Sequence, residues 1–217
     1  MNYIIDLKQL QKRNHQSRKI EPEYLRKSTA RFKALLAQVG YERRNPELHD
    51  ALCRYAGMLS TKATVKGLAL LGALGIGKSW GTEALAHFTR TKFVTASELV
   101  TAYEQGGVSE LLEVAIPLKL GFESDPEDLI IDEVGREPQS ATHYGTKLNV
   151  IEEVLRRRYI QWERHGARTI ITSNAFLRRD PRQLDKPSIE SLYGDDIADR
   201  VQQMCNIPQI GGCDLRQ

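Results

Sequence analysis

Eight consecutive residues, Gly72 to Ser79, have the types and spacing of a phosphate-binding loop. They match G-x-x-x-x-G-K-[ST] at every fixed position, after an apolar run at 68–71 and before a helical pattern at 82–88. Glycines let consecutive backbone N–H groups surround a phosphate, and a helix N-terminus adds partial positive charge. Lys78 is predicted to reach the β- and γ-phosphates of a nucleoside triphosphate, and the Ser79 hydroxyl to ligate Mg²⁺. The predicted nucleotide contacts are Gly72, Ala73, Leu74, Gly75, Ile76, Gly77, Lys78, Ser79 and Trp80.

A second chemical signal is the apolar run from Leu129 that ends in two acids, Asp132 and Glu133. Asp132 is predicted to lie beside the Mg²⁺ bound by Ser79. Glu133 is then free to orient and activate a water for attack on the γ-phosphate. Enzymes that transfer the phosphoryl group to another substrate have no need of a water-polarising Glu there. The paired acids therefore favour hydrolysis.

A third signal is the β-branched run Thr169 to Thr172, which continues into Ser173 and Asn174. Ligands gather at the C-terminal ends of the strands in parallel sheets. Asn174 is therefore predicted to hold the attacking water or to sense the γ-phosphate.

These residues need a sheet to position them. From Lys66 onward, strand and helix patterns alternate, which indicates a mostly parallel sheet with helices on its faces. A capping-box spacing at Thr95 predicts a helix that Gly106 and Gly107 interrupt and that resumes around 110–120. A long amphipathic helix ends at Gly166. The predicted strands are 67–71, 92–95, 129–132, 169–172 and 207–210.

The N-terminal region differs from the rest in charge. Residues 1–50 contain eleven Lys and Arg against six Asp and Glu, whereas the whole chain has a formal net charge of +3. This asymmetry suggests contact with nucleic acid or an acidic protein, and an ordinary solvated helical arm is the alternative. We predict a basic, helical, partner-binding extension at 1–45 and an ATPase domain at 46–217.

Two helices are predicted in and after this extension. One begins at Pro22 and is closed by Gly40, with Phe32, Leu35 and Leu36 on one face. The other covers about 46–58. The apolar face of the first helix is expected to lie in the groove of a partner protein, because the body has enough elements to bury its own sheet.

Composition and cysteine usage are those of an intracellular globular protein. Of the 217 residues, 41% are hydrophobic and 27% charged, and the sequence has neither a long apolar run nor a secretory signal. The cysteines Cys53, Cys205 and Cys213 are scattered and form no C-x-x-C pair, which argues for a reducing cytoplasm and against a structural zinc site. We expect a cytoplasmic location, no membrane association and buried thiols at Cys53 and Cys205.

Together the motifs resemble the AAA+ ATPases of the DnaC/DnaI helicase-loader and IstB group. The phosphate loop, the run 128–135 and the run 171–174 carry this resemblance, which covers about residues 46–217. It implies an α/β P-loop NTPase of AAA+ type, with a five-stranded, mostly parallel sheet sandwiched by helices. It further implies an N-terminal helical extension, no separate C-terminal lid domain, ATP and Mg²⁺ as cofactors, and self-assembly into an ATP-dependent oligomer.

The resemblance also implies roles for particular residues. Residues 193–201 are similar to the family box in which an arginine finger enters a neighbouring subunit, so Arg200 is the predicted finger. A helix-surface ion pair with Asp196 is the alternative. Arg216 corresponds to a second sensor arginine. In this family the segment matching 95–120 contacts single-stranded DNA, with Tyr103 as a stacking residue and Lys119 as a phosphate contact.

One further basic group is Arg156-Arg157-Arg158 on the long helix. Three consecutive arginines spread around a helix, so a solvated surface is expected.

Three functions remain open on the sequence alone. The first is an ATP-hydrolysing helicase loader that binds single-stranded DNA and a replicative helicase through the N-terminal extension. The second is an IstB-like ATPase that assists a transposase on double-stranded DNA. The third is a nucleotide-gated inhibitor that occupies a helicase without turnover; Glu133 and Arg200 count against it.

Overall fold

The strands that precede the predicted site residues are apolar on both faces, as a parallel sheet between two helical layers requires. In the computed structural model, residues 22–40, 45–60, 66–72, 74–118, 126–179 and 186–211 are described. Their main sheet has five strands in the order β2-β3-β6-β1-β7, all paired in parallel. The strands are β1 (Gly67–Leu70), β2 (Lys92–Thr95), β3 (Leu129–Val134), β6 (Thr169–Ser173) and β7 (Cys205–Asn206).

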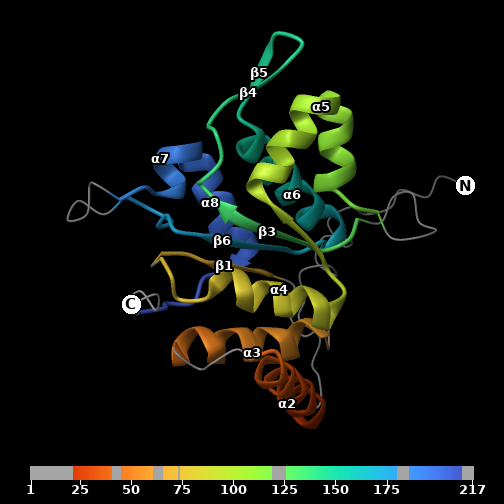
Figure 1. Ribbon diagram of the computed structural model, residues 1–217, viewed down its shortest axis with the longest axis vertical. Coiled ribbons are helices and arrows are strands. Elements are labelled where there is room, and N and C mark those ends of the chain that lie inside the picture. Colours follow the sequence, from red (N-terminus) through yellow and green to blue (C-terminus); the bar gives the residue numbers. More distant parts are fainter. Residues whose placement is uncertain are drawn as a thin grey trace, which may run out of the picture.

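Two apolar cores lie on the two faces of this sheet (Figure 1). Leu68 and Leu70 of β1 pack toward α4 (Lys78–Thr89), with α3 (Pro46–Ser60) and α2 (Pro22–Gln38) beyond it. Ala69 packs toward the opposite layer, which consists of α5 (Ala96–Ala115), α6 (Val150–His165), α7 (Ile189–Tyr193) and α8 (Asp195–Met204). The alternation along β1 follows from the two-residue period of a strand.

The strand order brings the three predicted motifs together. β6 lies between β1 and β3, pairing Ala69 with Ile171 on one side and Ile131 with Ile171 on the other. The residues that follow β6 therefore emerge between the phosphate loop and the acids of β3. The predicted five-stranded α/β arrangement is confirmed, and among the described residues no separate helical lid is present.

The last strand was predicted in the wrong place. Residues 207–210 are not a strand; β7 is Cys205–Asn206, paired with Gly67 and Leu68. Pro208 lacks an amide N–H and cannot donate to a strand ladder. The sheet therefore ends in a two-residue edge strand.

The predicted interruption of the helix after β2 is confirmed. Thr95 caps α5 through a reciprocal bond, with its hydroxyl accepting from the Glu98 amide at 3.1 Å. Gly107 has φ 65° and ψ −152° inside α5, so the helix is kinked there. The second half ends at Ala115, earlier than predicted, and Lys119 lies outside the described residues.

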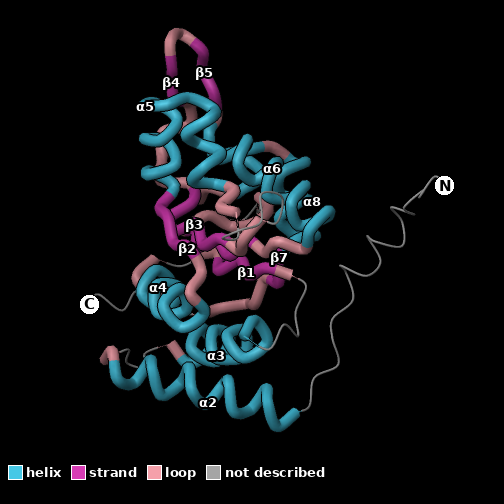
Figure 2. The backbone as a smooth tube through the Cα atoms, turned by 90° about the vertical axis from the view of Figure 1, so that its right-hand side faces the viewer, coloured by secondary structure: helices cyan, strands magenta, loops and turns pink. Residues whose placement is uncertain are grey.

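A two-stranded hairpin between β3 and α6 was not predicted. It consists of β4 (Ala141–His143) and β5 (Thr146–Leu148), paired antiparallel. Figures 1 and 2 both show it extending beyond the helical layer beside α5.

The expectation that the first helix offers its apolar face to a partner is wrong for its central residues. Phe32 and Leu36 are fully buried. The Phe32 ring lies 5.2 Å, centroid to centroid, from the ring of Phe88 on α4. At Gly57 on α3, a Cβ atom would come within 2.3 Å of the Thr29 hydroxyl, so α2 and α3 pack closely. The chain's own helices cover this face (Figure 2). The division at residue 45 stays a prediction, and residues 1–21 lie outside the described part.

The arginine triplet was only partly predicted correctly. Arg156 pairs with Glu152 and Arg157 with Glu153 on the surface of α6, at 2.9 and 2.5 Å. Arg158, in contrast, is fully buried. Its guanidinium reaches the starts of β3 and β6, where it donates to the Glu127 carbonyl, the Thr169 hydroxyl and the Arg168 carbonyl at 3.0, 2.9 and 2.7 Å. Burial lowers the pKa of Arg158 to about 10, which still leaves it charged at neutral pH.

The thiols of Cys53 and Cys205 are buried, as predicted. Burial raises the pKa of the Cys205 thiol to about 12, so this thiol stays protonated and unreactive at neutral pH. Cys213 lies outside the described residues.

Within the described part of the chain, no helix has the length and apolar character needed to cross a membrane.

The packing of α2 leads to a stability prediction. Replacing Phe32 with Ala should lower the free energy of unfolding by about 3–5 kcal/mol, because a fully buried ring is lost and a cavity remains. Tyr24, on the same helix but 65% exposed, provides the matched control: Tyr24→Ala should change stability by less than about 1 kcal/mol. Urea unfolding followed by circular dichroism measures both. Equal stability of the two variants would show that α2 does not belong to the core.

Candidate nucleotide-binding site

The phosphate loop has the backbone shape that its glycines make accessible. Gly72, Gly75 and Gly77 have φ values of +92°, +76° and +91°, in the left-handed region that side chains disfavour. Gly77 directly precedes α4, so the loop leads into the helix N-terminus. Ile76 is buried in the core beneath, and only its backbone remains for a ligand. Ala73 lies outside the described residues.

The Lys78 side chain spans from the loop to β6. It is only 6% exposed, and its Nζ donates to the Gly72 carbonyl at 2.8 Å and to Asn174 Oδ1 at 3.0 Å. The Gly72 amide in turn donates to the Ala175 carbonyl at 3.1 Å. The predicted cation and the predicted sensor thus touch, although 96 residues separate them in the sequence.

The two acids lie at an irregularity in β3. Ile131 pairs with Ile171 and Val134 with Ser173, so β3 has one more residue than β6 between these pairs. Such a bulge changes the direction of side chains near a strand end. Glu133 lies in it with φ +59°, one of three described residues other than glycine with positive φ. Asp132 is 5% exposed, while the Glu133 carboxylate is 44% exposed.

The Thr172 hydroxyl joins both acids to β6. It accepts a hydrogen bond from the Glu133 amide at 3.0 Å and donates one to Asp132 Oδ1. Thr172 is 1% exposed, so neither bond competes with bulk water. Sequence reasoning missed this residue. The available signal was a hydroxyl directly after the apolar pair Ile170-Ile171, two positions before Asn174.

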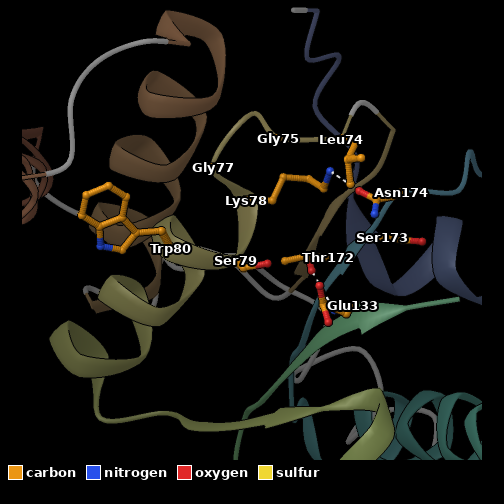
Figure 3. A pocket seen from close by; sticks show the side chains of 10 residues that line it. All are labelled: Leu74, Gly75, Gly77, Lys78, Ser79, Trp80, Glu133, Thr172, Ser173 and Asn174. Carbon is orange, nitrogen blue, oxygen red and sulfur yellow. Dashed lines mark hydrogen bonds between the residues drawn. The ribbon is translucent and has the colours of Figure 1, made fainter. Parts of the chain in front are cut away.

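Lys78, Glu133, Thr172 and Asn174 line one cleft with a volume of about 170 Å³ (Figure 3). Arg136, also missed from the sequence, pairs with the cleft residue Glu133 at 2.5 Å. The Trp80 ring is 47% exposed, and Figure 3 shows it apart from the polar side chains. The cleft is lined by Leu74, Gly75, Gly77, Lys78, Ser79, Trp80, Glu133, Thr172, Ser173 and Asn174.

The residues present fit a nucleotide with Mg²⁺. The buried ammonium of Lys78 donates to the neutral oxygens of Gly72 and Asn174, and an anionic phosphate would accept stronger, charge-assisted bonds from it. Ser79 supplies an exposed hydroxyl to the cleft, and Asp132 supplies a carboxylate oriented by Thr172. Hydroxyl and carboxylate oxygens are the donors that Mg²⁺ prefers.

Other predicted site residues lie away from this cleft. The Arg200 guanidinium is 5.1 Å from the centre of the Tyr159 ring and 3.9 Å from Asp196, and Arg200 does not line the cleft of its own chain. The predicted stacking residue Tyr103 is 2% exposed, so it cannot receive a base, and that prediction is wrong. Arg216 lies outside the described residues.

The sheet order, the phosphate loop at the end of β1 and the acids at the end of β3 define an α/β P-loop fold of AAA+ type. Among solved structures, the chain is similar to that of DnaI, with 19% identity and a TM-score of 0.54 over 88% of this chain and 95% of DnaI. It is also similar to a candidate primosome component from Streptococcus pyogenes serotype M3, with 19% identity and a TM-score of 0.50 over 77% and 81% of the two chains.

The DnaC helicase loader is a third similar structure, with 20% identity and a TM-score of 0.45 over 68% of this chain and 79% of DnaC. No protein-family model and no curated protein matches the sequence. The similarity to DnaI and to the candidate primosome component confirms the predicted resemblance at the level of the fold.

The position of Thr172 yields a prediction for the site. Thr172→Val keeps the shape of the side chain but leaves the Glu133 amide without its acceptor, which costs about 1–3 kcal/mol. We expect at least a tenfold slower single-turnover hydrolysis of ATP and a weaker Mg²⁺-dependent gain in nucleotide affinity. Thr172→Ser, which retains the hydroxyl, should restore both. Normal turnover in Thr172→Val would show that the bridge has no role in the site.

Proposed function

We propose that the protein is a Mg²⁺-dependent ATPase of the helicase-loader type, which binds single-stranded DNA and a replicative helicase during DNA replication. The observation that carries the ATPase part is the convergence of Lys78, Ser79, Glu133 and Asn174 on one cleft, with Asp132 held beside it. Three separate stretches of sequence supply these groups, and each supplies a different chemical requirement of phosphate-bond hydrolysis.

Each of these residues has a separate role in the proposed hydrolysis of ATP. The loop amides and Lys78 bind the β- and γ-phosphates and neutralise their charge. Bound Mg²⁺ would supply further neutralisation of the phosphate oxygens, held by Ser79 and Asp132. Glu133 accepts a proton from the attacking water, whose oxygen bonds to the γ-phosphorus as the bond to the ADP oxygen breaks. Asn174 sits against Lys78, where its amide can hold the water or the γ-phosphate.

Arg200 is proposed to complete the site of a neighbouring subunit. It is 28% exposed, and its present partners, Tyr159 and Asp196, leave it at the surface of α8. A guanidinium fits a phosphate group in geometry and charge. Within an oligomer, a surface arginine of this kind can enter the next cleft.

The replication role rests on the similarity of the fold to DnaI and to the candidate primosome component. The same comparison favours a helicase over a transposase as the protein partner. Because α2 is packed on the body, we place the helicase contact in the basic residues before Pro22.

The first test separates binding from hydrolysis. Lys78→Ala should weaken ATP binding about tenfold to a hundredfold, because a charge-assisted bond to phosphate is lost. Glu133→Gln should bind ATP normally but hydrolyse it about 10²–10⁴ times more slowly, because the amide cannot accept the proton. Binding of a fluorescent ATP analogue and release of phosphate measure the two effects.

Glu110→Gln, an exposed change on α5, is the matched control and should behave as the wild type. Full hydrolysis by Glu133→Gln would refute the assignment of the base.

The second test concerns assembly. If Arg200 acts in a neighbour's cleft, specific activity should rise with protein concentration. Mixing inactive Arg200→Ala with inactive Lys78→Ala should restore turnover, because one of the mixed interfaces has both groups intact. Arg157→Ala is the control, since Arg157 has a similar i,i+4 ion pair on α6 and should keep its activity. Absence of rescue, with both proteins self-associating, would leave Arg200 in its surface ion pair.

A further inference from the structure

The hairpin β4–β5 presents the most exposed large apolar side chain of the described residues. Tyr144, at its tip, is 96% exposed. The tip is a two-residue turn, Tyr144-Gly145, closed by the pairing of His143 with Thr146. Both turn residues have positive φ, +44° and +83°. Asn and Gly adopt a positive φ at the first turn position with little strain, whereas the backbone of a bulky tyrosine is strained there. An unfavourable residue that also exposes a ring to water points to a function.

The hairpin is firmly anchored to α5. The Tyr103 hydroxyl donates to the Thr146 carbonyl at 3.0 Å, and His143 Nδ1 lies 3.0 Å from the Glu104 carbonyl. The kink of α5 makes room for this contact. A Cβ atom at Gly107 would lie 2.8 Å from the His143 ring, so only glycine fits there. Tyr103, the residue predicted to stack on DNA, thus supports the hairpin instead.

Three rings follow one another from the core to the tip. Tyr103 is buried, and the centroid of its ring lies 5.9 Å from that of His143. The His143 ring in turn meets Tyr144 edge to face, 4.5 Å away at an interplanar angle of 73°. Tyr144 is 96% exposed, so this edge contact covers little of its ring and leaves the ring open to a partner. A flat aromatic partner can stack on such a ring.

The groups around the ring fit a nucleic acid strand better than an apolar protein surface. Thr142, Thr146 and Lys147 are exposed beside Tyr144. Residues 141–148 contain a lysine and a histidine but no carboxylate. An aromatic ring flanked by hydroxyls and a cation can stack on a base and contact its phosphate.

We propose that the β4–β5 hairpin is a contact site for single-stranded nucleic acid, with Tyr144 stacking on a base and Lys147 reaching a phosphate. This deepens the DNA-binding part of the proposed function and rests on it. The hairpin begins eight residues after Glu133 and leads directly into α6. The strand contact is therefore connected by a short stretch of chain to the residue that activates the water.

The test uses the full chain with Mg²⁺, a non-hydrolysable ATP analogue and a fluorescein-labelled oligothymidine of about 30 nucleotides. Tyr144→Asn should bind the oligonucleotide about tenfold more weakly by fluorescence anisotropy. Its melting temperature should equal or exceed that of the wild type, because asparagine tolerates positive φ. Tyr144→Trp should retain affinity. Tyr24→Ala, which removes an exposed tyrosine from α2, is the matched control and should bind normally.

A direct readout is photo-cross-linking of a strand substituted with 5-iododeoxyuridine, followed by peptide mapping. The proposal requires a cross-link at Tyr144, and cross-links confined to other segments overturn it. Wild-type affinity in Tyr144→Asn also overturns it, while leaving DNA binding by another surface intact. If the wild type binds no oligothymidine but hydrolyses ATP, the hairpin proposal fails and the ATPase survives. Unchanged DNA binding with lost self-association in sedimentation would assign the hairpin to a protein contact.

Discussion

The hydroxyl of Thr172 fixes the relation between the two strands that carry the candidate chemistry. β3 has one residue too many for its pairing with β6, and the backbone at Glu133 has a positive φ, which few residues other than glycine and asparagine adopt at low cost. The Thr172 hydroxyl satisfies the Glu133 amide and at the same time orients Asp132. The acid proposed to ligate Mg²⁺ and the acid proposed to accept the proton are thus set relative to each other by one buried side chain. The distance between these two acids and the phosphate loop depends in turn on β6, which lies between β1 and β3.

The amino-terminal and carboxyl-terminal ends of the strands are stabilised in different ways. At the end where β3 and β6 begin, the buried Arg158 bonds to two carbonyls and a hydroxyl, and Asp128 pairs with Arg168 at 2.6 Å. These charged side chains therefore all have partners within the protein. At the carboxyl-terminal ends of the strands, Lys78 bonds to neutral oxygens and the Glu133 carboxylate is half exposed. Groups of this kind can exchange their partners for a charged ligand at modest cost. The amino-terminal ends of the strands therefore hold the strands in register, while the carboxyl-terminal ends remain available to a ligand.

Local patterns were sufficient to predict the phosphate loop, four of the five main strands and the interruption of α5, because glycine, proline and apolar periodicity act over a few residues. Burial was harder to predict. Phe32, Tyr103 and Arg158 each have ordinary sequence surroundings, and only packing between distant segments decides that all three are inside. The hairpin at 141–148 is short and polar, so it resembles a loop in the sequence. The strand order that places Asn174 against Lys78 also depends on contacts almost a hundred residues apart, which no local pattern contains.

The packing of α2 has a mechanical consequence. Phe32 touches Phe88, which belongs to the helix that begins at Lys78. A protein that binds and pulls on the N-terminal segment would therefore act, through a single layer of side chains, on the helix whose first residues are proposed to bind the phosphates. The energetic coupling between two such sites is reciprocal. If engagement at the N-terminus alters the affinity for nucleotide, then the bound nucleotide must alter the strength of that engagement by the same factor, so the loading and release of a partner can be timed by the nucleotide alone.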